Sequence, residues 1–193
     1  KKMGAEIKLE GGDIIARASR LHGAHINFNI SSVGATGNTL MAAVLAKGTT
    51  LLQNAAMEPE ITNLGEYLID MGARIGGVGT NQLEIEGVDE LSFTDTEIIS
   101  DRIEAGTLLI AGAITKSEIE IELKNISHID SVLSKLQESG ANVIINKDIV
   151  KIDSRGLDIK SVDVSTAVYP GFPTDMQAQW ITYMTFAKGT SSV

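Results

Sequence analysis

An internal repeat sets the framework of this chain. Its three copies are Met3-Gly-Ala-Glu-Ile7, Met71-Gly-Ala-Arg-Ile75 and Ser139-Gly-Ala-Asn-Val143, and their glycines follow one another at a spacing of 68 residues. Each Gly-Ala pair follows a helix-like segment and precedes a run of alternating apolar residues. The glycine is therefore expected just past the end of a helix. A fixed period of this kind predicts successive copies of one structural unit.

The copy between Thr36 and Gly87 contains the whole unit. Its pattern predicts a helix over 37–46, a strand over 49–54, a helix over 60–71 and a hairpin of 74–76 with 82–86. The next copy predicts a helix over 103–113, a strand over 117–123, a helix over 129–139 and a hairpin of 142–145 with 149–152. A third copy begins with the helix after Asp175. Repeated αβαββ units with mixed sheets place the chain in the α/β class.

Composition narrows the classes of partner. The 193 residues include 25 acidic and 16 basic side chains, which gives a net charge of −9. This balance argues against binding to a nucleic-acid backbone. No apolar run approaches the roughly 20 residues of a membrane helix, no secretory signal opens the chain, and it has no cysteine. We expect a cytoplasmic protein, and both ends suggest an internal fragment of a larger polypeptide.

The stretch Tyr169-Pro-Gly-Phe-Pro-Thr-Asp-Met-Gln-Ala-Gln179 contains two of the three prolines. Pro170 and Pro173 are expected to stiffen an extended run that leads to an apolar helix over 176–186. Thr174 and Asp175 then stand at the helix start. One interpretation makes them N-caps, and the other makes Asp175 a carboxylate held in place for function. The residues alone leave both open.

The segment Ser32-Val-Gly-Ala-Thr36 lies where an extended run, 24–28, turns into a helix expected near Gly37. A helix N-terminus offers unpaired N–H groups to a phosphate, Gly34 permits close approach, and Ser32 adds a hydroxyl. The alternative is an ordinary strand-to-helix turn with a Ser or Thr cap.

Other candidate groups are well explained by structure alone. In Glu58-Pro-Glu60, the proline suits a first helical position and the carboxylates complement the helix dipole. In Asp101-Arg-Ile-Glu104, Asp101 is a candidate cap, and Arg102 is expected to pair with Asp101 or Glu104. His22 and His25 are close in sequence, but no acidic third ligand follows at metal spacing, so no metal site is predicted.

The segment Phe172-Pro-Thr-Asp-Met-Gln-Ala-Gln179 resembles the signature of the UDP-N-acetylglucosamine enolpyruvyltransferases. Three further segments agree in the same order, namely Ser32–Thr36, Asn54-Ala-Ala-Met-Glu-Pro-Glu-Ile61 and Asp101–Glu104. The resemblance implies the inside-out α/β barrel type of the enolpyruvyl transferases, with two globules of three units around inner helices. It implies that residues 1–99 are part of the first globule and residues 100–193 part of the second, truncated at both ends.

The resemblance also implies an activity. Members transfer an enolpyruvyl group from phosphoenolpyruvate to the 3-hydroxyl of UDP-N-acetylglucosamine, the first committed step of peptidoglycan precursor synthesis, without a cofactor or metal. It implies that Asp175 is the general base and that Asp101 has a catalytic or orienting role. The other implied roles are sugar binding by Thr174, diphosphate binding by Ser32, Val33 and Gly34, and support from Glu58, Glu60 and Arg102.

Two features separate this chain from a complete enzyme of that type. Ile30 stands where the family pattern has a lysine, which removes one cation from the phosphate site. The family's reactive cysteine (an aspartate in some members), a lysine and several arginines are absent from these residues. We therefore expect the chain to be inactive without the remainder of its parent chain.

Two alternatives remain open at this point. The sister enzyme that acts on shikimate 3-phosphate has the same fold, but it does not explain the match over 172–179. A non-catalytic repeat scaffold or a UDP-sugar-sensing paralogue would keep the motifs without turnover.

Overall fold

Three β-hairpins follow the three Gly-Ala pairs of the sequence. They are formed by β1 (Glu6–Glu10) with β2 (Asp13–Arg17), β5 (Arg74–Gly76) with β6 (Gln82–Glu86), and β8 (Asn142–Asn146) with β9 (Ile149–Asp153). All three are antiparallel pairs. The predicted repeat is therefore a structural repeat.

The glycine of each pair has a left-handed backbone. Gly72 has φ 104° and Gly140 has φ 92°. The N–H of Gly72 donates to Ile69 O at 2.8 Å and the N–H of Ala73 to Leu68 O at 2.9 Å, which is the Schellman pattern that ends a helix. Gly140 and Ala141 repeat it, with acceptors at Gln137 and Leu136. These bonds confirm the expected position past a helix end for Gly72 and Gly140, whereas Gly4 follows no helix in the structure.

The computed structural model describes residues 1–193, which divide into two compact units, Lys1–Ile98 and Ile99–Val193. In the first unit, a four-stranded sheet has the order β3-β4-β6-β5. Strand β3 (His25–Asn27) is parallel to β4 (Thr49–Gln53), and the other pairs are antiparallel. The β1–β2 hairpin forms a separate two-stranded sheet.

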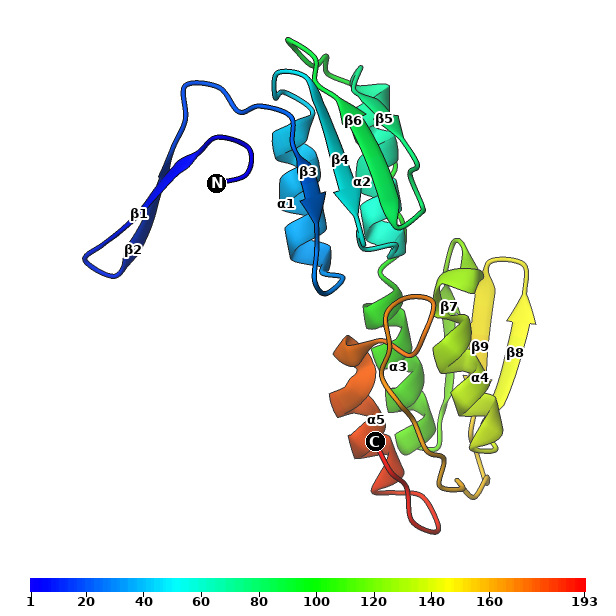
Figure 1. Cartoon of the computed structure of the whole chain (residues 1–193). Helices are drawn as coiled ribbons and strands as arrows, with labels where there is room; N and C mark the ends of the chain where they lie inside the picture. The colour runs from blue at the N-terminus through cyan, green and yellow to red at the C-terminus, as the bar shows by residue number, and fades with distance from the viewer. The chain divides into compact units, whose positions relative to one another are not determined.

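Helices α1 (Val33–Ala43) and α2 (Pro59–Asp70) cover one face of the four-stranded sheet (Figure 1). Side chains of β4 and β6 alternate between that face and the exposed one, as their sequence pattern predicts. Leu52 and Ile85 point into the core with Leu40 of α1 and Leu68 of α2. The order helix, strand, helix and hairpin is the predicted αβαββ unit.

The second unit repeats this order. It contains α3 (Arg102–Ile114), β7 (Glu118–Glu122), a 3-10 turn η1 (Ile126–Ile129), α4 (Asp130–Glu138), the β8–β9 hairpin, a 3-10 turn η2 (Thr174–Met176) and α5 (Gln177–Met184). The three-stranded sheet has the order β7-β9-β8. The chain is thus a mixed α/β structure in which no sheet closes into a barrel.

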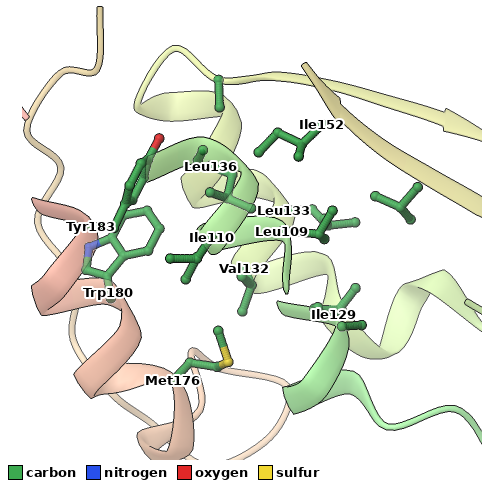
Figure 2. Packing of buried hydrophobic residues seen from close by; sticks show 14 of the residues in the cluster. Leu109, Ile110, Ile129, Val132, Leu133, Leu136, Ile152, Met176, Trp180 and Tyr183 are labelled. Carbon is green, nitrogen blue, oxygen red and sulfur yellow. The ribbon is translucent and has the colours of Figure 1, made fainter. Parts of the chain in front are cut away.

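The core of the second unit is built around an aromatic cluster. Trp180 and Tyr183 of α5 are fully buried, and the ring of Trp180 meets Phe172 and Tyr183 edge-on at centroid distances of 5.5 and 5.3 Å. Figure 2 shows both side chains, with Met176, beside Ile110 of α3. The packing of α5 on α3 therefore holds the segment that precedes α5.

Two local predictions were wrong. Helix α1 begins at Val33, four residues before Gly37, because Ser32 provides the N-cap. Residues 168–171 form a turn and are not extended, since the Gly171 N–H donates to Val168 O at 2.8 Å and the Tyr169–Pro170 peptide is cis. Only the end of the run is extended as predicted, where Phe172 forms a β-bridge with Thr166 and Pro173 has φ −71° and ψ 139°. The structure contains no helix long and apolar enough to cross a membrane.

Candidate active site

The first group of candidate residues lies beyond the ends of β3 and β4. Because these strands are parallel, their carboxyl ends share one sheet edge, where α1 and α2 begin. Ser32 is extended, and its Oγ accepts a hydrogen bond from the Ala35 N–H at 3.3 Å. Val33 and Gly34 are the first helical residues, so their N–H groups have no acceptor within the helix.

Gly34 has open space around it. A methyl group added there would meet no atom within 4 Å, and its φ is not positive. The fold therefore does not require glycine at this position. Ile30, on the same loop, has 79% of its surface exposed. Together these residues leave an accessible helix N-terminus without a neighbouring lysine.

A hydrogen bond joins the two helix-starting loops. The buried hydroxyl of Thr36 accepts from the Ala56 N–H at 2.9 Å, and the Asn54 amide donates to Phe28 O at 2.9 Å. Asn54 itself has φ 56°, a left-handed backbone that asparagine tolerates. These contacts fix the loop after β4 against the loop that leads to Ser32.

Glu58 and Glu60 flank Pro59 at the start of α2. Glu58 precedes the helix without capping it, and its Oε2 is buried without a hydrogen-bond partner. Glu60 is exposed in the first turn, where a carboxylate complements the helix dipole. The pair therefore lies at the same end of the sheet as Ser32. The predicted interaction of a carboxylate with the helix dipole applies to Glu60, which lies in the first turn.

In the second unit, Asp101 is the N-cap of α3. Its Oδ1 accepts from the N–H groups of Ile103 at 2.8 Å and Glu104 at 3.0 Å, so the capping interpretation is confirmed. Arg102 is only 8% exposed, and its guanidinium carbon lies 5.6 Å from the centre of the Tyr169 ring. That stacking links the start of α3 to the proline-containing turn.

Asp175 does not cap a helix. It lies within η2, and neither η2 nor α5 has a side-chain cap. Thr174 and Asp175 are both exposed, and the Asp175 carboxylate makes no hydrogen bond or ion pair within the chain. The capping interpretation of these two residues is therefore wrong. Figure 2 shows that Met176, the next residue, points into the core.

The structure brings η2 against α3, so Asp175 lies on a turn that packs on the helix capped by Asp101. Elsewhere, His22 and His25 are exposed, and His25 Nε2 lies 2.8 Å from Gln53 Oε1. The structure contains no cluster of three or more metal-ligating side chains.

Sequence reasoning missed three residues that hold these segments. They are Thr36, which bonds the loop after β4, and Gly106 and Thr107 of α3, which contact the residues around Asp175. The spacing of Met176, Trp180 and Tyr183 on one helical face was a signal that this helix packs against another. Nothing in the sequence marks the residues of α3 that receive it.

Relatives and solved structures resemble the whole chain. The chain is 54% identical to "UDP-N-acetylglucosamine 1-carboxyvinyltransferase" of Chloroherpeton thalassium, and the match covers 100% of the chain and 45% of that relative. It is 53% identical to the protein of the same name from Chlorobium chlorochromatii, and that match covers 100% of the chain and 46% of the relative. The chain therefore spans about half the length of these relatives.

Among solved structures, the enolpyruvyl transferase NikO from Streptomyces tendae superimposes with a TM-score of 0.83 at 24% identity, covering 97% of this chain and 48% of that one. This likeness establishes the shared fold. The model of one protein family matches residues 1–193. By that match, the chain belongs to the EPSP synthase (3-phosphoshikimate 1-carboxyvinyltransferase) family.

Proposed function

We propose that the protein to which this chain belongs transfers the enolpyruvyl group of phosphoenolpyruvate to the 3-hydroxyl of UDP-N-acetylglucosamine and releases phosphate. The observation that carries the proposal is the identity of 54% and 53%, over the whole chain, with two relatives named UDP-N-acetylglucosamine 1-carboxyvinyltransferase. The reaction would be the first committed step of peptidoglycan precursor synthesis, in a bacterial cytoplasm.

The proposed general base is Asp175. A sugar hydroxyl is a weak nucleophile until a base takes its proton, and a carboxylate does so only if it is accessible and uncommitted. Asp175 meets both conditions, since it is exposed and makes no bond within the chain. As the proton passes to Asp175, the sugar oxygen adds to the phosphate-bearing carbon of phosphoenolpyruvate and the methylene carbon takes up a proton. Loss of that proton, together with cleavage of the bond from the same carbon to phosphate, restores the double bond. Thr174, exposed beside it, would hold the sugar ring.

The proposed diphosphate site is the start of α1. The N–H groups of Val33 and Gly34 lack helical acceptors, and the open space at Gly34 leaves room for a phosphate oxygen. Ser32 would contribute its hydroxyl. With Ile30 in place of a lysine, binding there depends on the helix N-terminus and not on a neighbouring cation at that position.

The remaining residues have supporting roles in this proposal. Asp101 would orient groups at the start of α3 while it caps the helix, and Arg102 would brace the turn at Tyr169. Glu58, with its unpaired buried oxygen, would shape the site from the loop after β4. The remainder of the parent chain would supply the groups that these residues do not include.

Action on shikimate 3-phosphate is the second candidate, because the matching family model bears the name of that carboxyvinyltransferase. However, the two relatives named for the UDP-sugar share more than half of their aligned residues with this chain. We therefore favour the UDP-sugar. A non-catalytic paralogue would bind UDP-N-acetylglucosamine without phosphate release.

The experiment compares Asp175→Asn and Asp175→Ala in the full-length parent protein. Loss of a general base typically lowers kcat by about 10²–10⁴. Since the carboxylate makes no bond in the fold, neither variant should change the melting temperature. Phosphate release from phosphoenolpyruvate is measured with UDP-N-acetylglucosamine and, separately, with shikimate 3-phosphate. Normal turnover in both variants would refute the assigned role, and turnover with shikimate 3-phosphate alone would refute the substrate.

A further inference from the structure

The turn that carries Asp175 is anchored by the residue after it. Met176 is fully buried, and its side chain fills the space that a side chain at position 106 would occupy if Gly106 were a larger residue. A Cβ on Gly106 would lie 2.9 Å from Met176 Cε, 3.1 Å from Met176 Sδ and 3.2 Å from Ile129 Cδ1. Because Met176 is fully enclosed in the core, a methyl group at position 106 would press its thioether against the residues packed around it, and that side chain is attached directly to the backbone of η2.

A second contact fixes the same helix face. The Thr107 hydroxyl donates to Ile103 O at 2.7 Å, so it accepts from Gln179 Nε2 at 3.0 Å. Met176 Sδ lies 4.0 Å from the same hydroxyl. Gln179 Oε1 is buried without a partner, which leaves the bond to Thr107 as the polar attachment of this amide. Two adjacent residues of α3 therefore hold η2 and the first turn of α5.

We propose that Gly106 and Thr107 are positioning residues for Asp175. This rests on the proposed function of Asp175 as the base. The Asp175 carboxylate makes no bond of its own within the chain, so its position depends on where the backbone of η2 lies. On one side of Asp175, Phe172 and Pro173 are buried, and on the other Met176 is seated against Gly106. A shift of Met176 relative to Gly106 would therefore move the Asp175 carboxylate. The proposed substrate-binding residues of the first unit are not mutated by such a change.

The main test is Gly106→Ala in the full-length parent protein. A displacement of about 1 Å in a reacting group can cost about 10²-fold in rate. We expect kcat to fall about 10–100-fold, with the KM for each substrate within about threefold of wild type.

The matched control is Gly112→Ala in the same helix. A Cβ there would meet Ile119 Cδ1 and Ile152 Cγ2 at 3.0 Å, so it is equally crowded, but on the side of the sheet and away from η2. It should lower the melting temperature about as much as Gly106→Ala and leave kcat of the folded protein unchanged.

Three further variants keep the test decisive if Gly106→Ala folds poorly. Adding Met176→Leu removes the Cε atom nearest to the new methyl group and should restore most of kcat. Thr107→Val removes the acceptor of Gln179 and should lower kcat about tenfold, whereas Thr107→Ser keeps the hydroxyl and should remain close to wild type.

The outcomes separate this inference from the proposed function. Full activity of Asp175→Asn would overturn the role of the base and, with it, any positioning role. If Asp175→Asn is impaired but Gly106→Ala has the kcat of Gly112→Ala, or Thr107→Val that of Thr107→Ser, the positioning role alone is overturned.

Discussion

At Asp101, an effect on stability can be measured separately from an effect on catalysis, because its carboxylate accepts hydrogen bonds from the first turn of α3. Asparagine keeps an oxygen that can accept from the Ile103 and Glu104 N–H groups, whereas alanine leaves these two N–H groups without a side-chain acceptor. Replacing an Asp N-cap by Ala costs about 1 kcal/mol. Asp101→Asn loses only the charge at the helix N-terminus, about 0.3–1 kcal/mol. The alanine variant should therefore be the less stable of the two.

Thermal melts followed by circular dichroism measure this difference. In a cooperative unit of this size, about 1 kcal/mol corresponds to about 4–8 °C in Tm. Glu104→Gln is the control, since it removes an exposed carboxylate from the same turn without touching the cap. Equal destabilisation by Asp101→Asn and Asp101→Ala would show that the two hydrogen bonds do not stabilise α3.

Kinetics of the same variants in the full-length protein test the second role. If Asp101 also orients reacting groups, both variants should lose a similar factor in kcat, although their stabilities differ. If kcat of the folded fraction stays at the wild-type value in both, Asp101 is a cap and nothing more.

Two more predictions concern one group in each unit. Gly34→Val should leave the melting temperature of the unliganded protein nearly unchanged, since a Cβ there meets no atom within 4 Å. It should weaken UDP-N-acetylglucosamine binding at least tenfold in calorimetry, and unchanged affinity would place the diphosphate elsewhere. The hydrogen bonds from Arg155 lower the pKa of Asp153 from 3.8 to about 2. Because the folded pKa is the lower one, this pair stabilises the fold above about pH 4 and ceases to do so as pH falls toward 2. Arg155→Gln should raise the pKa of Asp153 in an NMR titration, and an unchanged value would mean that another group lowers it.

Much of the fold was predictable because the relevant signals are local. The β5–β6 hairpin has the predicted bounds, since alternating side chains and the glycines between them specify it within thirteen residues. The start of α1 was placed too late, because Gly34 and Gly37 are weak helix formers. What extends the helix to Val33 includes the cap at Ser32 and the contact of Thr36 with Ala56, a residue twenty positions away.

The candidate site was less predictable for the same reason. The motif around Asp175 could be recognised, but whether its carboxylate caps a helix depends on where α5 begins. That start is set by the burial of Met176 and Trp180 against α3, about seventy residues earlier in the chain. Gly106 gave no signal, because its role comes from a side chain that arrives from a distant segment.

The Schellman ends at Gly72 and Gly140 have an evolutionary consequence. Each of these junctions between helix and hairpin is held by two hydrogen bonds within six residues. The N–H groups of Gly72 and Ala73 donate to Ile69 O and Leu68 O, and Gly140 and Ala141 make the equivalent bonds in the next copy. A duplicated unit that inherits this junction also inherits the direction in which its hairpin leaves the helix. Core residues and loop lengths are then free to diverge between copies, as they have between the five-residue β5–β6 loop and the two-residue β8–β9 loop.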